Sequence, residues 1–148
     1  MDLEELLREG RIRKEKISFQ EIKRALARAE RDLKTARKIM AEDWDWGFAV
    51  TYNAVLQASR AYMFAKGYRP SHGEGHKNTF TFMKIVMGEE YEDLISYFDR
   101  MRNKRNQAIY DVAGLITETE AKNLFAKATE FVKLIFIAVN FETSNPKG

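Results

Sequence analysis

The fold is decided by residues 48–66, FAVTYNAVLQASRAYMFAK, whose apolar side chains point in almost every direction around a helix. A helix that is apolar around most of its circumference must be covered by neighbours on most sides. Asp43 or Asp45 can cap its start, and Gly67 can end it. We therefore predict a helix that runs to about Lys66 and lies at the centre of a helical bundle.

A narrow polar strip interrupts this apolar surface at Asn53, Gln57 and Arg60. Limited solvent access at a seam between two helices is the simplest explanation of such a strip. The alternative is that the strip takes part in binding a nucleic acid or a nucleotide. We retain all three residues as candidate binding residues.

The preceding helix is predicted from a capping box, in which Ser18 is followed three residues later by Glu21. Apolar residues then recur every three or four positions, as on the buried face of a helix: Ile22, Leu26, Ala29, Leu33, Ala36 and Met40. The opposite face is basic: Arg24, Arg28, Arg31, Lys34 and Lys38. A solvated face is the more common explanation of such a row, and a track for RNA is the alternative.

The rest of the chain reads as further helices separated by turns. We expect a short helix over 2–9, a charged connector over 11–16, a loop over 68–75, and helices over 77–86, 89–110 and 117–141. No strand pattern or domain linker stands out. The prediction is one all-α domain over residues 1–148, an up-and-down bundle of about five helices. Residues 1–17 would be the short N-terminal helix and connector, and 143–148 a flexible tail.

Composition narrows the class of protein. Hydrophobic residues make up 45% and charged residues 32% of the chain, an ordinary globular balance. No apolar run reaches the roughly eighteen residues of a membrane span. Met1 is followed by acidic residues rather than by the basic start of a signal peptide. We therefore expect a cytoplasmic protein with no membrane partner, and its net charge of +3 permits a nucleic-acid partner without requiring one.

Metal binding has little support in the sequence. The chain contains no cysteine, so a thiolate site is excluded. Its two histidines, His72 and His76, lie in a segment broken by Gly73 and Gly75, where the spacing does not place them on one helical face. A structural role is favoured for both histidines, with His76 capping or packing at the start of the next helix. We expect no metal site and no cofactor.

The last predicted helix carries more apolar surface than one packed face needs. From Phe131 to Phe141, apolar side chains occupy nearly every direction except that of Lys133. One buried face requires a stripe of only about 100°. The surplus predicts a protein–protein contact, most simply a homodimer and otherwise a second protein.

Two arginines project from the apolar side of the fourth long helix. Its buried stripe leads to Arg102 and Arg105, while Arg100, Asn103 and Lys104 should point away. Arginine keeps its charge, so an inward guanidinium needs a carboxylate, a wet crevice or an anionic ligand.

Beside these arginines lie Asn106 and, one turn on, Tyr110. Guanidinium, amide and phenol groups together suit a phosphodiester. The alternative is an internal salt bridge to Glu89, to Asp111 or to an acidic residue of another helix.

The stretch Arg105-Asn106-Gln107-Ala108-Ile109-Tyr110 resembles the signature of HEPN domains, an Arg often followed by a polar residue and then by a His a few positions later. The wider layout is also similar to HEPN-type proteins of archaea and bacteria, including Ala65-Lys66-Gly67-Tyr68 and the turn Gly75-His76-Lys77. The resemblance implies a helical bundle that dimerises and brings two signature helices together in a cleft.

The resemblance also implies a function related to RNA or nucleotides. Members of the family include metal-independent RNases, often toxins paired with a small nucleotidyltransferase, and non-catalytic binding proteins. In the nucleases the Arg binds the scissile phosphate and the His assists attack by the ribose 2′-OH. Arg105 would take the role of phosphate ligand, and Asn106 that of its polar neighbour.

The sequence departs from the signature at the expected His, where Tyr110 stands. A tyrosine with an ordinary pKa of about 10 is a far poorer base near neutral pH than a histidine. We therefore expect a homodimeric RNA- or nucleotide-binding protein that works with a minimal nucleotidyltransferase in a toxin–antitoxin or defence module. One alternative is a metal-independent endoribonuclease that uses Arg105 and Tyr110, or that borrows His76 as the base. A second alternative is a non-catalytic assembly protein.

Overall fold

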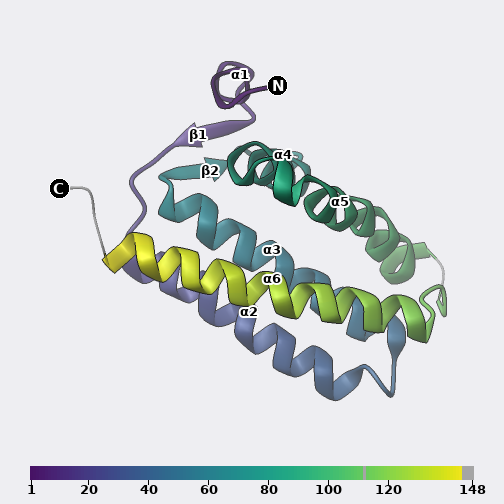
Figure 1. Cartoon of the computed structure of the whole chain (residues 1–148). Coiled ribbons are helices and arrows are strands. Elements are labelled where there is room, and N and C mark those ends of the chain that lie inside the picture. Colours follow the sequence, from purple (N-terminus) through teal and green to yellow (C-terminus); the bar gives the residue numbers. More distant parts are fainter. Residues whose placement is uncertain (112, 145–148) are drawn as a thin grey trace.

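The computed structural model describes residues 1–111 and 113–144 of the chain, and these form an all-α bundle with a small two-stranded sheet (Figure 1). Helix α3 (Trp44–Ala65) lies at its centre, as its apolar surface predicts. The Asp43 carboxylate accepts a hydrogen bond from the Trp46 N–H at 3.0 Å, so Asp43 is the N-cap. Asp45 instead accepts hydrogen bonds from the backbone N–H groups of Gly114 and Ile116.

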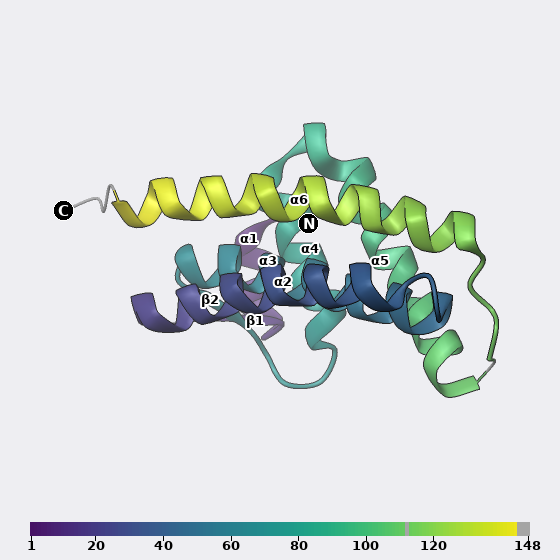
Figure 2. The ribbon, with the colours of Figure 1, turned by 90° about the horizontal axis from the view of Figure 1, so that it is seen from below.

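Helices α2 (Phe19–Ile39) and α6 (Glu118–Ser144) lie alongside α3, and both views show the three long helices packed together (Figures 1 and 2). The predicted capping box is complete at the start of α6, whereas at the start of α2 Ser18 caps the helix but the Glu21 carboxylate binds Arg69. Ser18 Oγ accepts the Glu21 N–H at 3.2 Å, and Thr117 and Glu120 bond each other reciprocally.

A second layer covers the remaining side of α3. It consists of α4 (Gly75–Met87), the 3₁₀ turn η1 (Glu89–Tyr91) and α5 (Glu92–Asn106), followed by the π-helical turn η2 (Gln107–Asp111). The sequence predicted one continuous helix over 89–110. The structure instead divides that stretch into the 3₁₀ turn, the α-helix and the π-helical turn.

A short antiparallel sheet corrects the expectation of a chain without strands. After the short helix α1 (Leu3–Arg8), strand β1 (Ile12–Lys14) lies in the predicted connector. Strand β2 (Tyr68–Pro70) lies in the predicted loop, and Ile12 pairs with Pro70. Each strand has three residues, too few to show an alternating pattern.

Side-chain contacts hold the sheet against the bundle. Ile12 is buried, and Arg69 binds the carboxylates of Glu15 and Glu21.

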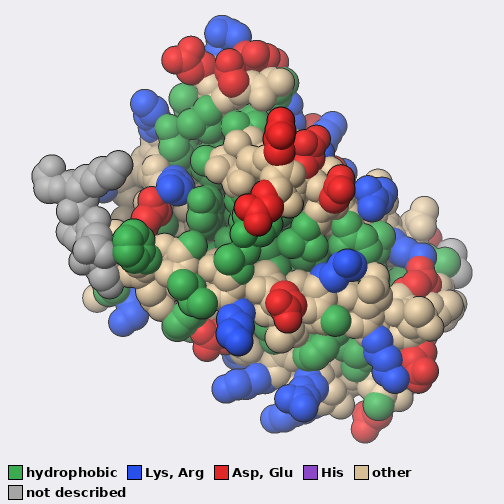
Figure 3. Space-filling model, in the orientation of Figure 1, with side chains coloured by type: hydrophobic (Ala, Val, Ile, Leu, Met, Phe, Trp, Pro, Cys, Tyr) green, Lys and Arg blue, Asp and Glu red, His purple; other side chains and the backbone are tan. Residues whose placement is uncertain are grey.

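The last helix leaves much of its apolar surface uncovered. Phe131 and Ile135 are buried, and the Phe131 ring packs on Phe98 of the second layer, whereas Phe136, Ile137 and Phe141 are exposed. Figure 3 shows hydrophobic side chains gathering over α6 and between α6 and the α4–α5 layer. Helix α6 extends through residues 143 and 144, which the sequence assigned to a flexible tail; the rest of that tail lies outside the described residues. Within the described part of the chain, no helix combines the length and hydropathy of a membrane-spanning segment.

Candidate anion-binding site

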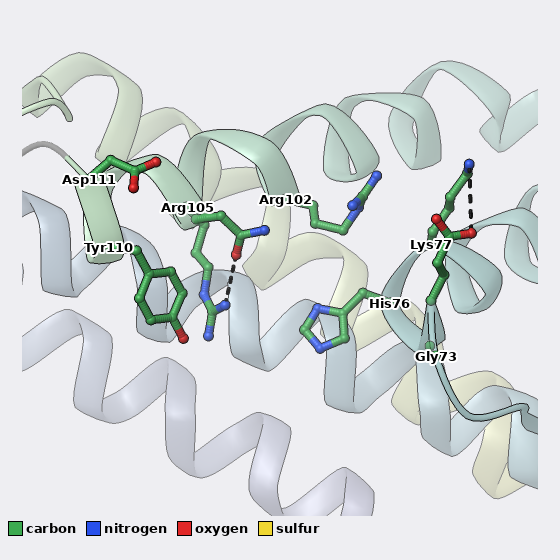
Figure 4. A pocket seen from close by; sticks show the side chains of 10 residues that line it. Gly73, His76, Lys77, Arg102, Arg105, Tyr110 and Asp111 are labelled. Carbon is green, nitrogen blue, oxygen red and sulfur yellow. Dashed lines mark hydrogen bonds and ion pairs between the residues drawn. The ribbon is translucent and has the colours of Figure 1, made fainter.

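A pocket of about 510 Å³ opens between the N-terminus of α4 and the C-terminal end of α5 (Figure 4). Three segments that are distant in sequence supply its walls: the glycine-containing turn into α4, the last turns of α5, and η2. The lining residues are Gly73, Glu74, Gly75, His76, Lys77, Arg102, Arg105, Asn106, Tyr110 and Asp111. We call this pocket the α4–α5 pocket. The structure thus brings together four residues predicted from the sequence, Arg102, Arg105, Asn106 and Tyr110.

Arg105 is the cation of this pocket for which no carboxylate partner is found among the described residues. Its Nη1 donates to Asn106 Oδ1 at 3.0 Å, and its guanidinium carbon lies 5.6 Å from the centre of the Tyr52 ring. Its Nε is buried and has no hydrogen-bond partner, and among the described residues no carboxylate lies within ion-pair distance of it. A guanidinium held in this way by an amide and a ring face retains donors for an anion.

The sequence left open whether Arg102 pairs with an internal carboxylate or faces a ligand site, and in the structure it does both. It lines the pocket, and its Nε also binds Asp99 Oδ1 at 3.1 Å. The internal partner is therefore a carboxylate one turn earlier on α5, not Glu89 or Asp111. This pair is partly exposed, so it weakens the charge of Arg102 without removing it from the pocket.

Lys104 differs from its predicted outward direction. Its ammonium group binds the carboxylate of Glu120 on α6, and both side chains are only partly exposed. The contact joins α5 to α6.

The π-helical turn η2 places Tyr110 at the mouth of the pocket. The Tyr110 side chain is 72% exposed, although it lines the pocket with Arg105. In Figure 4 the Tyr110 ring and the Arg105 side chain extend in the same direction from the end of α5. An exposed ring beside an arginine offers a surface on which a nucleic-acid base can stack.

The sequence favours a structural role for His76, but in the structure this residue lines the pocket. It occupies the first turn of α4, and Figure 4 shows its imidazole between Arg102 and Arg105. Its Nδ1 lies 3.0 Å from the Tyr52 hydroxyl. In the sequence, His76 stood out only through the turn Gly75-His76-Lys77 and as a base that the site could borrow, because its partner Tyr52 comes from another helix.

The environment of His76 strongly favours a neutral imidazole. Burial is the main cause, and the guanidinium groups of Arg60, Arg105 and Arg102 add to it; together they lower the pKa of His76 to about 4. At neutral pH the ring therefore contributes hydrogen-bonding nitrogens and no charge.

The N-terminus of α4 adds further positive potential. The first backbone N–H groups of a helix lack partners within the helix, and the helix dipole places partial positive charge there. Lys77 lies in this first turn, about 4.0 Å from the exposed carboxylate of Glu74. Anions bind readily where such a terminus meets arginine side chains.

The three residues of the predicted polar strip on α3 do not all line one site. Gln57 and Arg60 line a second pocket of about 510 Å³, between α2 and α3, together with Glu21, Arg24, Ala25, Arg28 and Phe64. We call it the α2–α3 pocket. Asn53 is partly buried on α3, and the lining of neither pocket includes it among the described residues.

Comparison with known proteins gives one family. Residues 22–138, from the second turn of α2 to the later turns of α6, match the family model described as HEPN domain. No curated protein matches the chain. The matched segment contains the whole of the α4–α5 pocket.

Proposed function

The chain belongs to the HEPN domain family, whose members are generally related to nucleotides or RNA, and from this premise we propose that it binds RNA or a nucleotide through the α4–α5 pocket. A phosphate group would lie against Arg105 and Arg102, with Asn106 and Lys77 as further hydrogen-bond donors. Tyr110 would stack on a base at the pocket mouth.

The position of Arg105 is the observation that carries this proposal. A partly buried guanidinium without a carboxylate partner is costly unless an anion accompanies it. The amide of Asn106 and the ring of Tyr52 orient Arg105 but neutralise none of its charge. A phosphate supplies the missing negative charge and accepts from the planar fork of donors.

Binding without cleavage fits this pocket better than catalysis. Tyr110 is exposed, and no hydrogen bond from another described residue holds its hydroxyl in place for proton transfer. His76 with a pKa of about 4 is a weak base at neutral pH.

A metal-independent RNase is the second candidate, and the presence of His76 beside Arg105 favours it. In that reaction a base takes the proton of the ribose 2′-OH, whose oxygen attacks the adjacent phosphorus while the 5′-oxygen leaves with a proton. A bound phosphate would offset the nearby guanidinium charges and raise the pKa of His76 toward that of a useful base. In this form of the reaction His76 would be the base, so neither Tyr110 nor a histidine at its position would be required.

One set of measurements tests both candidates. Fluorescence anisotropy with a labelled single-stranded RNA and with a mononucleotide measures binding, and a gel with RNA in EDTA measures cleavage. Arg105→Ala should weaken binding at least tenfold, because it removes a charge-assisted contact worth about 1.5–3 kcal/mol. Arg100→Ala is the matched control, because Arg100 is an exposed arginine of the same helix. The binding proposal fails if wild-type protein retains neither ligand, and cleavage lost in Arg105→Ala would establish the enzyme.

We further propose that the chain acts as a homodimer beside a minimal nucleotidyltransferase in a toxin–antitoxin or defence module. The exposed Phe136 and Ile137 on α6 support a protein contact, and the family supports the type of partner. Sedimentation of the wild type and of Ile137→Asp tests the homodimer. A purely structural role remains the third candidate, and an Arg105→Ala variant that only loses stability would support it.

A further inference from the structure

Arg60 lies between the α4–α5 pocket and the α2–α3 pocket. It belongs to α3 and lines the α2–α3 pocket. Its Nη2 is 3.9 Å from the position that a β-carbon on Gly75 would occupy, and Gly75 lines the α4–α5 pocket. The charge of Arg60 also contributes to the low pKa of His76. The two pockets therefore adjoin at this one side chain.

Arg60 itself lacks a compensating partner. Its Nε is buried without a hydrogen bond, and burial lowers the pKa of its guanidinium group. In the described part of the chain it forms no ion pair within 4.0 Å. Arg60 and Arg105 are thus both partly buried guanidinium groups with an unbonded Nε and no close carboxylate among the described residues, and both line a pocket.

Two further arginines line the α2–α3 pocket without a close carboxylate partner in the part of the chain that the structure describes. Arg24 and Arg28 stand on successive turns of α2, both exposed, and no ion pair to either is found among the described side chains. The one carboxylate in this pocket, Glu21, already binds Arg69 at 2.7 Å. That contact is the main cause of the lowered pKa of Glu21, to which the charge of Arg24 also contributes. One carboxylate thus stands against the three arginines that line this pocket. The pocket therefore keeps a net positive charge.

The other walls of the α2–α3 pocket can meet a base and a sugar. Gln57 offers both an amide donor and an acceptor, and Phe64 offers a ring whose neighbour is the Arg69 guanidinium, 4.9 Å from its centre. A site for inorganic anions alone would need only the arginines. Aromatic and amide groups between cations are typical of surfaces that bind single-stranded nucleic acid.

We propose that the α2–α3 pocket is a second phosphate subsite, so that a single strand of RNA runs from the α4–α5 pocket across Arg60 to Arg24 and Arg28. This proposal rests on the proposed function and specifies its ligand: an oligoribonucleotide, not a mononucleotide. It also gives part of the basic row on α2 a role other than that of a solvated face.

The experiment compares ligands of two lengths with two matched double variants. Arg24→Gln/Arg28→Gln removes two charges from the α2–α3 pocket. Arg8→Gln/Arg37→Gln is the control, because it removes two charges from exposed arginines that line neither pocket. Anisotropy measures the affinity of each protein for a labelled twelve-nucleotide RNA and for a labelled mononucleotide, over a range of salt concentrations. Circular dichroism confirms that each variant is folded.

The expected result is specific to length. The pocket double variant should bind the oligonucleotide about tenfold more weakly, and its salt dependence should fall by about 1.4 in log–log slope, the value for two phosphate contacts on a single strand. Its affinity for the mononucleotide should fall much less, because a single phosphate can occupy the α4–α5 pocket without reaching α2, and the control should change neither affinity. Equal losses in the two double variants would show a general charge effect and overturn the second subsite.

The possible outcomes distinguish failure of the second subsite from failure of RNA or nucleotide binding by the α4–α5 pocket. Loss of oligonucleotide binding in Arg105→Ala, together with wild-type affinity in Arg24→Gln/Arg28→Gln, overturns the second subsite alone. Absence of binding of either ligand by the wild type overturns both. Arg60→Gln should weaken oligonucleotide binding at least as much as the double variant, since Arg60 would contact the strand between the subsites.

Discussion

The Tyr52 hydroxyl lies 3.0 Å from Nδ1 of His76, joining the buried centre of α3 to the first turn of α4 at the floor of the α4–α5 pocket. Tyr52 is fully buried, and burial raises the pKa of its phenol, so the hydroxyl keeps its proton. A neutral imidazole carries one proton on either nitrogen, and this contact permits both tautomers. The tautomer decides what His76 can do for a ligand.

Binding and cleavage require opposite tautomers. For binding, Tyr52 donates to Nδ1 and the Nε2–H donates to the phosphate; for cleavage, Nε2 must have a free lone pair. We predict the Nε2–H form in the wild type and a pKa of about 4 for the ring. Nitrogen chemical shifts of the His76 side chain measure both properties. A free Nε2 lone pair in the RNA-bound state would favour the RNase.

The low pKa of His76 predicts a loss of stability in acid. In the unfolded chain the His pKa is about 6.5, so between that pH and about pH 4 the unfolded state binds more protons than the folded state. Stability must therefore fall as the pH falls through this window. Over this pH range the free energy of unfolding of His76→Gln should fall by about 1–2 kcal/mol less than that of the wild type, a difference already reduced for solvent screening. Urea unfolding at a series of pH values measures the difference, and His72→Gln, which leaves His76 in place, is the control.

Asp99 competes with a ligand for Arg102. Because its carboxylate binds the Arg102 Nε, Asp99→Asn should free that charge for phosphate and tighten RNA binding. The gain should be about two- to fivefold, the range for a partly exposed ion pair. Asp93→Asn is the matched control, since it removes an exposed carboxylate from the first turn of the same helix. Equal gains in both variants would indicate only a change in net charge.

The turn between α2 and α3 depends on Gly47. A β-carbon at this position would lie 2.8 Å from the Met40 Cα, closer than backbone and side chain can approach. Gly47→Ala should therefore lower the free energy of unfolding by about 1–3 kcal/mol, as overpacking does. At Gly75 the added β-carbon would meet Arg60 at an ordinary 3.9 Å, so Gly75→Ala should be tolerated. Urea denaturation of the two variants measures the contrast.

Asp45 connects the start of α3 to the segment after η2. Its two carboxylate oxygens accept the N–H groups of Gly114 and Ile116, the latter at 3.0 Å. Asp45→Ala leaves both donors without this partner and should cost about 1–3 kcal/mol. Hydrogen exchange should speed up at Gly114 and Ile116 and leave the centre of α3 protected. Uniform acceleration over the whole chain would show that the contact supports the fold globally and not this segment.

Much of the fold could be predicted from local patterns. The apolar circumference of 48–66 requires a central helix, and Ser18 and Thr117 mark helix starts because their hydroxyls bond N–H groups three residues away. The surplus apolar surface after Phe131 is likewise visible in the sequence. The strands β1 and β2 could not be predicted, because each is three residues long and is held by pairing with a distant segment.

Part of the candidate site, like part of the fold, could be predicted from the sequence, and the rest depends on tertiary packing. Its arginines were visible because Arg102 and Arg105 follow the periodicity of a single helix, so the sequence by itself determined an inward-facing pair of cations next to Asn106. Only the tertiary structure placed His76 between them, gave Arg102 its partner Asp99, and positioned Arg60 between two pockets. Helical periodicity fixes which face a side chain takes, but which side chains face one another across helices depends on how those helices pack.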